Sequence, residues 1–433
     1  MRICVIAVFA SSFLLAADDP QLALILKAQS EFERVELAPV PELRDTISCT
    51  QTQAAVLPLA PPEEQSMVRY RKGFCTLAGA VITHNASEFT QAAAEFDKAI
   101  EAWPARSQGR GKKLPPEPVP PVLRTLGAVG RLQAASSSMA AGPAPEGLDA
   151  VLEQSGKDLL SSTEQPCAAN VMQAARCTAF QETGRQWLGW LALRRNDLTE
   201  AARDFTGSAG SGWSEWVAGR RAFQDGNYKE AASQYRQAVN LARRGPAESL
   251  VGRLAPTPNV PAELIELGGA QLLAGDSNGA IATLDEAVKA SPSNARALFL
   301  RARAKETAGQ AEAALADYNL ASRAAFAGAK DLASGEAHLY RGILLFRRKD
   351  YPHAEDEFAS ALNFEIPGGL RADAVAWRHL AAVATGSCDA SRQYLERSLS
   401  AASPYFPKAE ARTLISACPA TISGNAAQGI GPN

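Results

Sequence analysis

One spacing pattern recurs five or six times between Glu182 and Ser400 and constrains the fold more than any other feature. A small residue is followed twelve residues later by alanine, then four residues on by a bulky apolar residue and three further by another small one. The clear copies start at Gly189, Gly219, Gly268, Ala302 and Gly342. Self-similarity at a period of about 30–50 residues indicates stacked helical hairpins, because one hairpin cannot bury both of its faces alone.

The segment Pro261–Asn294 holds the fullest copy. Its pattern residues are Leu264, Leu267, Gly268, Gly275, Asp276, Ala280, Leu284, Ala287 and Pro292. Small residues at Gly268 and Ala280 let two helices approach closely, while Leu284 fills the space toward the next hairpin. Gly275 lets the chain reverse between the helices.

These residues resemble the tetratricopeptide repeat, a helix-turn-helix unit of 34 residues. The resemblance implies an all-α fold, a right-handed α-solenoid of stacked repeats that follows an irregular helical N-terminal region. The segments that we expect are a signal peptide (1–17), an N-terminal helical region with one divergent repeat (18–105), a Pro/Gly-rich linker (106–121), a degenerate helical spacer (122–169), the repeat array (170–402), a capping helix (403–418) and a disordered tail (419–433).

The first residues of the chain have the pattern of a secretory signal. Arg2 supplies a positive charge, Ile3–Leu15 an apolar core, and Ala16 with Ala17 a small-residue cleavage site. The apolar run is too short to span a bilayer, and no other stretch of about 18 apolar residues follows it. We therefore expect an exported, bacterial-type protein that is periplasmic or extracellular after cleavage.

Cysteine usage agrees with export. Six cysteines follow the signal segment, and they form three pairs that are local in the sequence. The pairs that we expect are Cys49–Cys75, Cys167–Cys177 and Cys388–Cys418. The middle pair requires a break in the helix, because ten helical residues rise about 15 Å whereas bridged Cα atoms lie about 4.4–6.8 Å apart. The alternative is free, buried thiols in a reducing compartment.

No constellation of catalytic residues is recognisable, so we predict no enzyme activity, no cofactor and no metal. The four histidines, His84, His338, His353 and His379, are dispersed without partners at ligand spacing. The formal net charge of −2 gives no general attraction for nucleic acid or anionic lipid.

The resemblance implies that the first helix of each repeat lines a concave groove that binds a protein or peptide. The groove residues that follow from the family's offsets are Trp190, Trp213, Trp216, Arg220, Phe223, Arg296, Phe299, Arg303, Phe346 and Arg347. They suit an extended or helical apolar segment with some negative charge. Three alternatives stay open: tryptophans that fill the core between repeats, a groove that handles polysaccharide or cell-wall fragments, and a self-associating array.

Overall fold

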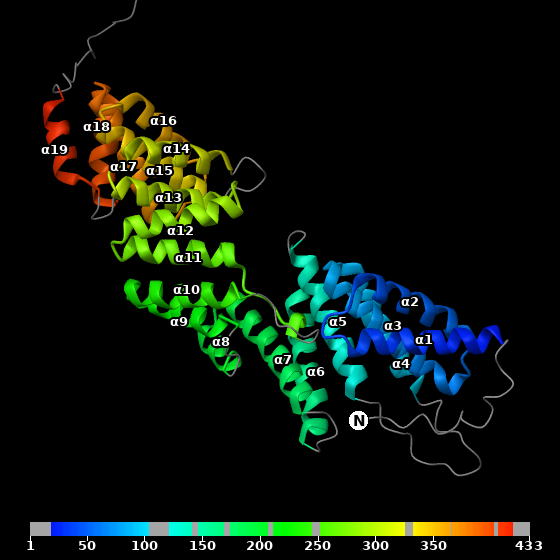
Figure 1. The fold of residues 1–433 in the computed structure, drawn as a ribbon. Helices are drawn as coiled ribbons and strands as arrows, with labels where there is room; N and C mark the ends of the chain where they lie inside the picture. The colour runs from blue at the N-terminus through cyan, green and yellow to red at the C-terminus, as the bar shows by residue number, and fades with distance from the viewer. Residues whose placement is uncertain are drawn as a thin grey trace, which may run out of the picture. The chain divides into compact units, whose positions relative to one another are not determined.

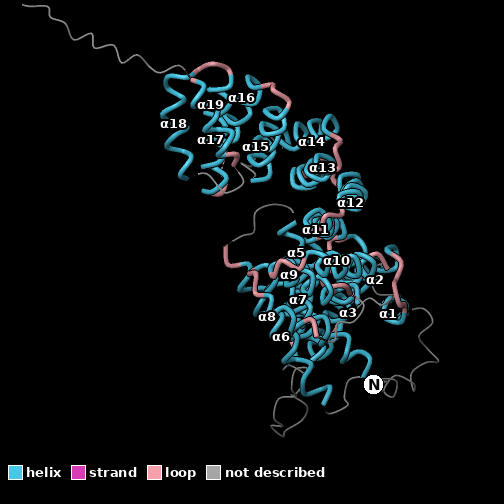
Figure 2. Tube along the Cα trace, turned by 90° about the vertical axis from the view of Figure 1, so that its left-hand side faces the viewer, coloured by secondary structure: helices cyan, strands magenta, loops and turns pink. Residues whose placement is uncertain are grey.

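The computed structural model describes residues 19–103, 121–140, 146–168, 174–206, 211–244, 252–324, 332–364, 366–401 and 406–418. Within these ranges the regular elements are nineteen α-helices and two short 3-10 helices, with no strand (Figure 2). The predicted signal peptide, linker residues 106–120, the predicted tail and the side chain of Cys167 lie outside the described residues. None of the described helices combines the length and the apolarity that crossing a bilayer requires.

The helices form two compact units, residues 1–221 with 240–258 and residues 222–239 with 259–433, called here the N-terminal and the C-terminal unit (Figure 1). The first nine helices are α1 (Pro20–Leu37), α2 (Leu43–Val56), α3 (Pro62–Thr83), α4 (Ala86–Glu101), α5 (Pro121–Ala140), α6 (Leu148–Ala168), α7 (Ala174–Arg194), α8 (Leu198–Asp204) and α9 (Trp213–Gln224). The others are α10 (Tyr228–Ala242), α11 (Val260–Leu273), α12 (Ser277–Ala290), α13 (Ala295–Thr307), α14 (Ala311–Ala324), α15 (Leu332–Arg347), α16 (Tyr351–Ala361), α17 (Gly368–Ala384), α18 (Cys388–Ala401) and α19 (Lys408–Ala417). The predicted all-α solenoid of helical repeats is confirmed.

In the N-terminal unit each helix from α1 to α7 packs against the next one along the chain. A continuous core runs through these pairs, with Phe96, Leu132 and Leu159 fully buried. Gly130 allows α5 to approach α4 closely, since a Cβ atom there would lie 3.1 Å from the Cβ atom of Ala93. A disulfide joins Cys49 of α2 to Cys75 of α3, with 6.0 Å between the Cα atoms.

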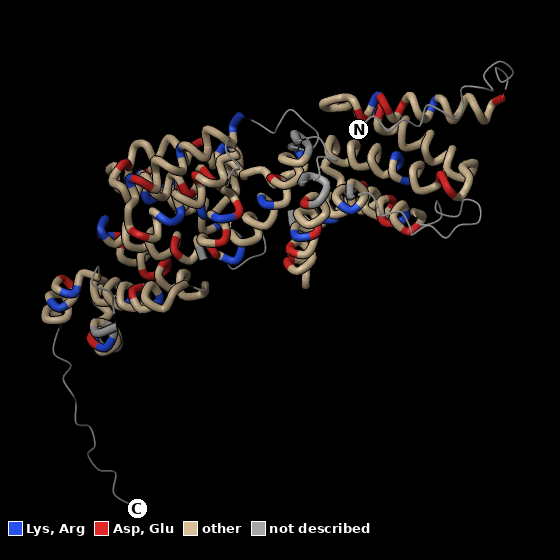
Figure 3. The backbone as a smooth tube through the Cα atoms, turned by 90° about the horizontal axis from the view of Figure 1, so that it is seen from below, with Lys and Arg blue, Asp and Glu red and all other residues tan. Residues whose placement is uncertain are grey.

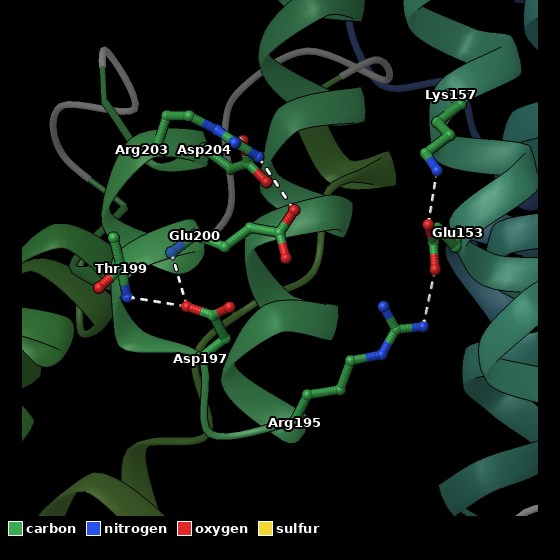
Figure 4. A network of polar contacts seen from close by, with 8 residues as sticks. All are labelled: Glu153, Lys157, Arg195, Asp197, Thr199, Glu200, Arg203 and Asp204. Atoms are coloured by element: carbon green, nitrogen blue, oxygen red, sulfur yellow. Dashed lines mark hydrogen bonds and ion pairs between the residues drawn. The ribbon is translucent and has the colours of Figure 1, made fainter.

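Ion pairs tie the ends of helices together in the same unit (Figure 4). Glu153 of α6 accepts hydrogen bonds from Lys157 and from Arg195, the residue after α7, at 2.5 and 2.8 Å. Both hydrogen bonds lower the pKa of Glu153, and the bond from Lys157 has the larger effect. Asp197 caps α8 by accepting from the backbone N–H groups of Thr199 and Glu200. Pairs exposed in this way contribute about 0–1 kcal/mol each, so they orient the helix ends more than they stabilise the fold.

A segment that follows α10 returns to the core of the N-terminal unit. Its 3-10 helix, η3 (Gly252–Leu254), places Leu254 at 1% exposure among residues of the preceding helices. The carbonyl oxygen of Leu254 accepts a 3.0 Å hydrogen bond from Nε1 of Trp187 and a second bond from the amide of Gln133. No residue of the recurring sequence pattern falls in 252–254, yet the structure uses Leu254 as part of the core.

In the C-terminal unit the hairpins α11/α12, α13/α14, α15/α16 and α17/α18 follow one another, and α19 packs against α17 and α18. The small residue of the repeat lies directly beneath the bulky one. A Cβ atom at Gly268 would lie 2.5 Å from Cγ of Leu284, and one at Gly342 would lie 2.6 Å from Cε1 of Phe358. The pattern therefore records where the two helices of one hairpin touch.

The tight turns inside the hairpins use left-handed backbone conformations. Gly275 and Gly309 have φ angles of 86° and 79°, which glycine adopts without a steric penalty. Asp276 then caps α12 through a hydrogen bond from Gly279 N–H to its carboxylate. At the end of this unit a disulfide joins Cys388, the first residue of α18, to Cys418 directly after α19, with 5.7 Å between the Cα atoms.

Candidate functional site

The residues predicted to line the groove belong to both units. Trp190, Trp213, Trp216 and Arg220 lie in the N-terminal unit. The remaining six are Phe223, Arg296, Phe299, Arg303, Phe346 and Arg347, in the C-terminal unit.

The tryptophans of the N-terminal set take part mainly in packing. Trp213 is buried, stacks on Phe205 with 5.3 Å between the ring centroids, and donates a 3.0 Å hydrogen bond from Nε1 to the carbonyl oxygen of Pro256. Trp190 packs edge-on against Trp187 at 5.7 Å. A buried indole with its N–H satisfied offers no open face for a sugar ring, which the glycan alternative needs.

Trp216 is the tryptophan of this set with an unused polar group. Its ring is partly buried and meets Trp213 edge-on, and the guanidinium of Arg220 lies 4.9 Å from the ring centroid. Its Nε1 atom is buried and has no hydrogen-bond partner among the described residues. In the same part of the solenoid, the guanidinium of Arg194 lies over the ring of Trp190 at 5.2 Å.

In the C-terminal unit, three contacts of charged side chains join the neighbouring first helices α13 and α15. Arg296 pairs with Glu336 at 3.0 Å. Arg347 pairs with Glu306 at 2.9 Å. The residues that make these contacts, together with the Arg303–Tyr340 pair, are called the α13–α15 strip: Arg296, Arg303 and Glu306 on α13, with Glu336, Tyr340 and Arg347 on α15.

The third contact of the strip is a stacking of charge on an aromatic ring. The guanidinium carbon of Arg303 lies 3.9 Å from the centroid of the Tyr340 ring. Tyr340 in turn packs on Phe299, with 5.6 Å between centroids. Phe299 and Phe346 are both buried: Phe299 packs under the strip through Tyr340, whereas Phe346 packs against Tyr351 and Trp377.

The strip mixes both signs of charge, as do the helices of the C-terminal unit in general (Figure 3). Arg296 and Arg347 are more exposed than their partners: their side chains are 51% and 63% exposed, against 13% for Glu336 and 15% for Glu306. Sequence reasoning named the arginines and missed both glutamates. Both glutamates lie at groove positions of the repeat. Glu306 follows the small residue Ala302 by four residues, as Phe346 follows Gly342, and Glu336 precedes Gly342 by six, as Arg296 precedes Ala302.

A second charged network joins first helices to second helices. Arg301 of α13 binds Asp317 of α14 through two hydrogen bonds of 2.7 Å and Asp285 of α12 at 2.8 Å. Lys305 also reaches Asp317, at 2.7 Å. Asp317 is deeply placed, so this network is part of the packing between hairpins and not a surface for a ligand.

One carboxyl group stands out electrostatically. Glu263 of α11 is 2% exposed, and neither of its carboxylate oxygens has a hydrogen-bond partner among the described residues. Burial disfavours its charged form and raises its pKa to about 7. Burial is the cause of this pKa shift, and no charged neighbour contributes to it. The shift therefore affects the stability of the fold and does not indicate a pair of interacting catalytic groups.

The histidines do not converge on a site. His338 contacts Glu357 at 2.8 Å and His353 contacts Asp350 at 2.7 Å. His379 stacks on Tyr394 at 5.0 Å, and its pKa is lowered by burial and then by Arg378. Within the described ranges, no three His, Cys, Asp or Glu side chains are grouped so as to hold a metal ion.

Comparison with known structures returns helical repeat proteins of low identity. MamA from Desulfovibrio magneticus RS-1 is 18% identical, with 43% of this chain and 95% of that chain covered and a TM-score of 0.34. A tetratricopeptide repeat protein from Thermus thermophilus is 16% identical, with 47% and 99% covered and a TM-score of 0.34. The Cut9–Hcn1 complex is 13% identical, with 92% and 93% covered and a TM-score of 0.40. Comparison with curated proteins gives no significant match.

The family model of the tetratricopeptide repeat matches residues 266–330. This range begins within α11 and contains α12, α13 and α14, with the Gly268–Leu284 contact and the turns at Gly275 and Gly309. The match therefore falls on the part of the chain where the residue pattern is clearest. Residues 266–330 thus match the tetratricopeptide repeat, and the same residue spacing recurs in the hairpins beside them.

Proposed function

We propose that the chain is a non-enzymatic, exported scaffold that binds a segment of a partner protein along the first helices of its C-terminal unit. Proteins of this family are generally scaffolds for protein–protein interaction. The observation that carries the proposal is the α13–α15 strip, in which exposed guanidinium groups are held in place by less exposed carboxylates and by an aromatic ring. Guanidinium groups fixed in this way are common anchors of peptide recognition.

The neighbouring first helices extend this surface with apolar groups. Leu273, at the end of α11, is 53% exposed, and Ile343 of α15 is partly exposed. Helix α13 packs against both α11 and α15, so the charged strip and these side chains belong to one row of helices. A peptide segment that combines apolar and polar side chains fits such a row.

Export is part of the proposal. The disulfides Cys49–Cys75 and Cys388–Cys418 support an oxidising compartment. The sequence of residues 1–17 supports a cleaved signal peptide. A fusion of residues 1–30 to a reporter enzyme that is active only after export tests this: activity is expected, and an inactive reporter of normal abundance would contradict it.

Site-specific photocrosslinking tests the surface. A photoreactive amino acid replaces Arg296 in the strip or, as a control, Arg323, which is exposed on the second helix α14. Peptides selected from a displayed random library of dodecamers are expected to crosslink at position 296 and not at position 323. Equal crosslinking at both positions, or failure to select any peptide, would refute the groove as the binding surface.

A further inference from the structure

We infer that Arg303, stacked on Tyr340, is a subsite for one acidic side chain, Asp or Glu, in the middle of the bound peptide segment. This inference rests on the proposed function, since it concerns the same row of first helices. It adds the chemical character of the ligand and the residue that reads it.

The charges of the strip leave one cation uncompensated. Glu336 neutralises Arg296, and Glu306 neutralises Arg347. Arg303 has no hydrogen bond from its guanidinium to any described residue, and its contact is with the face of the Tyr340 ring. The N–H groups of this guanidinium are therefore available, and they match a carboxylate in charge and in geometry.

The surroundings explain why Arg303 is left without a carboxylate. Glu306 lies three residues further along α13 and would be the natural partner. It is engaged on its other side, because one carboxylate oxygen accepts from the hydroxyl of Tyr318 at 2.7 Å and the other from Arg347 at 2.9 Å. Tyr318 is fully buried, so its hydroxyl fixes the position of Glu306, whose two carboxylate oxygens both have partners other than Arg303.

The aromatic ring orients the guanidinium before a ligand arrives. A cation–π contact at 3.9 Å restricts one face of Arg303, while Tyr340 itself is supported by buried Phe299. A cation held in this way loses little side-chain entropy on binding, which favours specific recognition.

The position of Arg303 favours an internal side chain over the end of a peptide. Along α13 and α15 the strip continues in both directions, to the Arg296–Glu336 pair and to the Arg347–Glu306 pair. A bound chain that uses both neutral pairs passes over Arg303 without ending there. Exposed Leu273 and partly exposed Ile343 favour apolar residues on either side of the acidic one.

The test uses the oxidised protein, residues 18–433, and a displayed random library of dodecamer peptides. Selected peptides are expected to share one Asp or Glu flanked by apolar residues. In a synthetic copy of a selected peptide, replacing that acid by its amide is expected to weaken binding about tenfold or more, since hydrogen bonds between charged groups are the stronger ones. Arg303→Gln is expected to bind the acid and the amide peptides equally, while Arg323→Gln keeps the wild-type preference.

The outcomes separate the two proposals. Peptides that bind along the strip but show no preference for an acid, or a preference that Arg303→Gln retains, would overturn the subsite and leave the scaffold standing. Selected peptides that lose binding when their C-terminal carboxylate is amidated would overturn the internal position. Failure to select any peptide would overturn the proposed function itself. Thermal unfolding of Arg303→Gln like that of the wild type confirms that the variant is folded.

Discussion

Arg301 and Arg341 make equivalent contacts one repeat apart. Each lies one residue before the small residue of its repeat and binds the acidic residue that precedes the bulky one, Asp317 at 2.7 Å and Glu357 at 2.9 Å. Each also reaches back to the second helix of the preceding repeat, to Asp285 at 2.8 Å and to Asn319 at 3.4 Å. One arginine thus joins three helices in each of two successive repeats, which fixes their mutual packing.

Removing Arg301 is expected to destabilise the C-terminal unit, because the side chain of Asp317 is only 4% exposed and would lose two of its hydrogen bonds. We expect Arg301→Met to cost about 3 kcal/mol, since the buried carboxylate of Asp317 would keep Lys305 but lose its two-bonded cationic partner. Urea unfolding measures the change. The double variant with Asp317→Leu is expected to recover much of the loss, and Arg323→Met, on the exposed side of α14, to have little effect. A loss for Arg301→Met no larger than the control would contradict this account.

Glu263 makes stability depend on pH. Its pKa in the folded protein is about 7, above the ordinary value of 4.5, so the folded state binds its proton more tightly than the unfolded state does. The stabilisation that protonated Glu263 gives to the folded state is fully present below about pH 4.5. It is lost as the pH rises through about 7. Glu263→Gln should therefore stabilise the protein at pH 8, by at most about 3 kcal/mol, and change little at pH 4.

Thermal unfolding of Glu263→Gln and of the wild type at the two pH values checks this prediction. Glu266→Gln, on the same helix and less buried, is the control and should be nearly neutral at both. Equal effects of Glu263→Gln at pH 4 and pH 8 would show that its carboxyl is not the titrating group.

Gly342 tests the contact that underlies the repeat pattern. Alanine at this position would place a Cβ atom 2.6 Å from the ring of Phe358, so Gly342→Ala is expected to destabilise by about 1–3 kcal/mol through overpacking. Gly369→Ala is the matched control, because nothing lies within 4 Å of a Cβ atom there. Chemical unfolding of both variants measures the difference. If Phe358→Leu fails to relieve the loss in Gly342→Ala, the clash is not its cause.

The disulfide Cys388–Cys418 should hold α19 in place. Helix α19 packs against α17 and α18, and the bridge closes a sequence separation of 30 residues. Replacing both cysteines by serine is expected to reduce the stability of this end by about 3 kcal/mol. Hydrogen exchange should then become faster in α19 and stay unchanged in α11–α14. Unchanged protection of α19 in the variant would show that its packing alone is sufficient.

The sequence predicted what depends on neighbours along the chain. Helix starts follow from proline, which is preorganised for the first helical positions: α1 begins at Pro20 and α3 at Pro62. The contact between Gly342 and Phe358 was also encoded locally, because both residues belong to one hairpin. Local periodicity is sufficient for such features.

Contacts between distant segments could not be predicted in this way. Trp213 occupies a groove offset, yet its burial depends on Pro256, 43 residues further along. The pairing of Arg347 with Glu306 depends on how α13 and α15 pack, which the spacing within one repeat does not specify. For the same reason the resemblance indicated the row of helices but not which of its arginines remains uncompensated.

The return of Leu254 to the N-terminal unit has a consequence for the order of events during synthesis. The helices α1–α8 emerge from the ribosome before Leu254 does, yet Trp187 and Gln133 find their carbonyl partner only in that residue. A nascent chain that ends at residue 244 lacks this partner and leaves a gap in its core. The N-terminal unit can therefore reach its final stability only after α9 and α10 have been made, which couples its completion to the synthesis of residues 222–239 of the C-terminal unit.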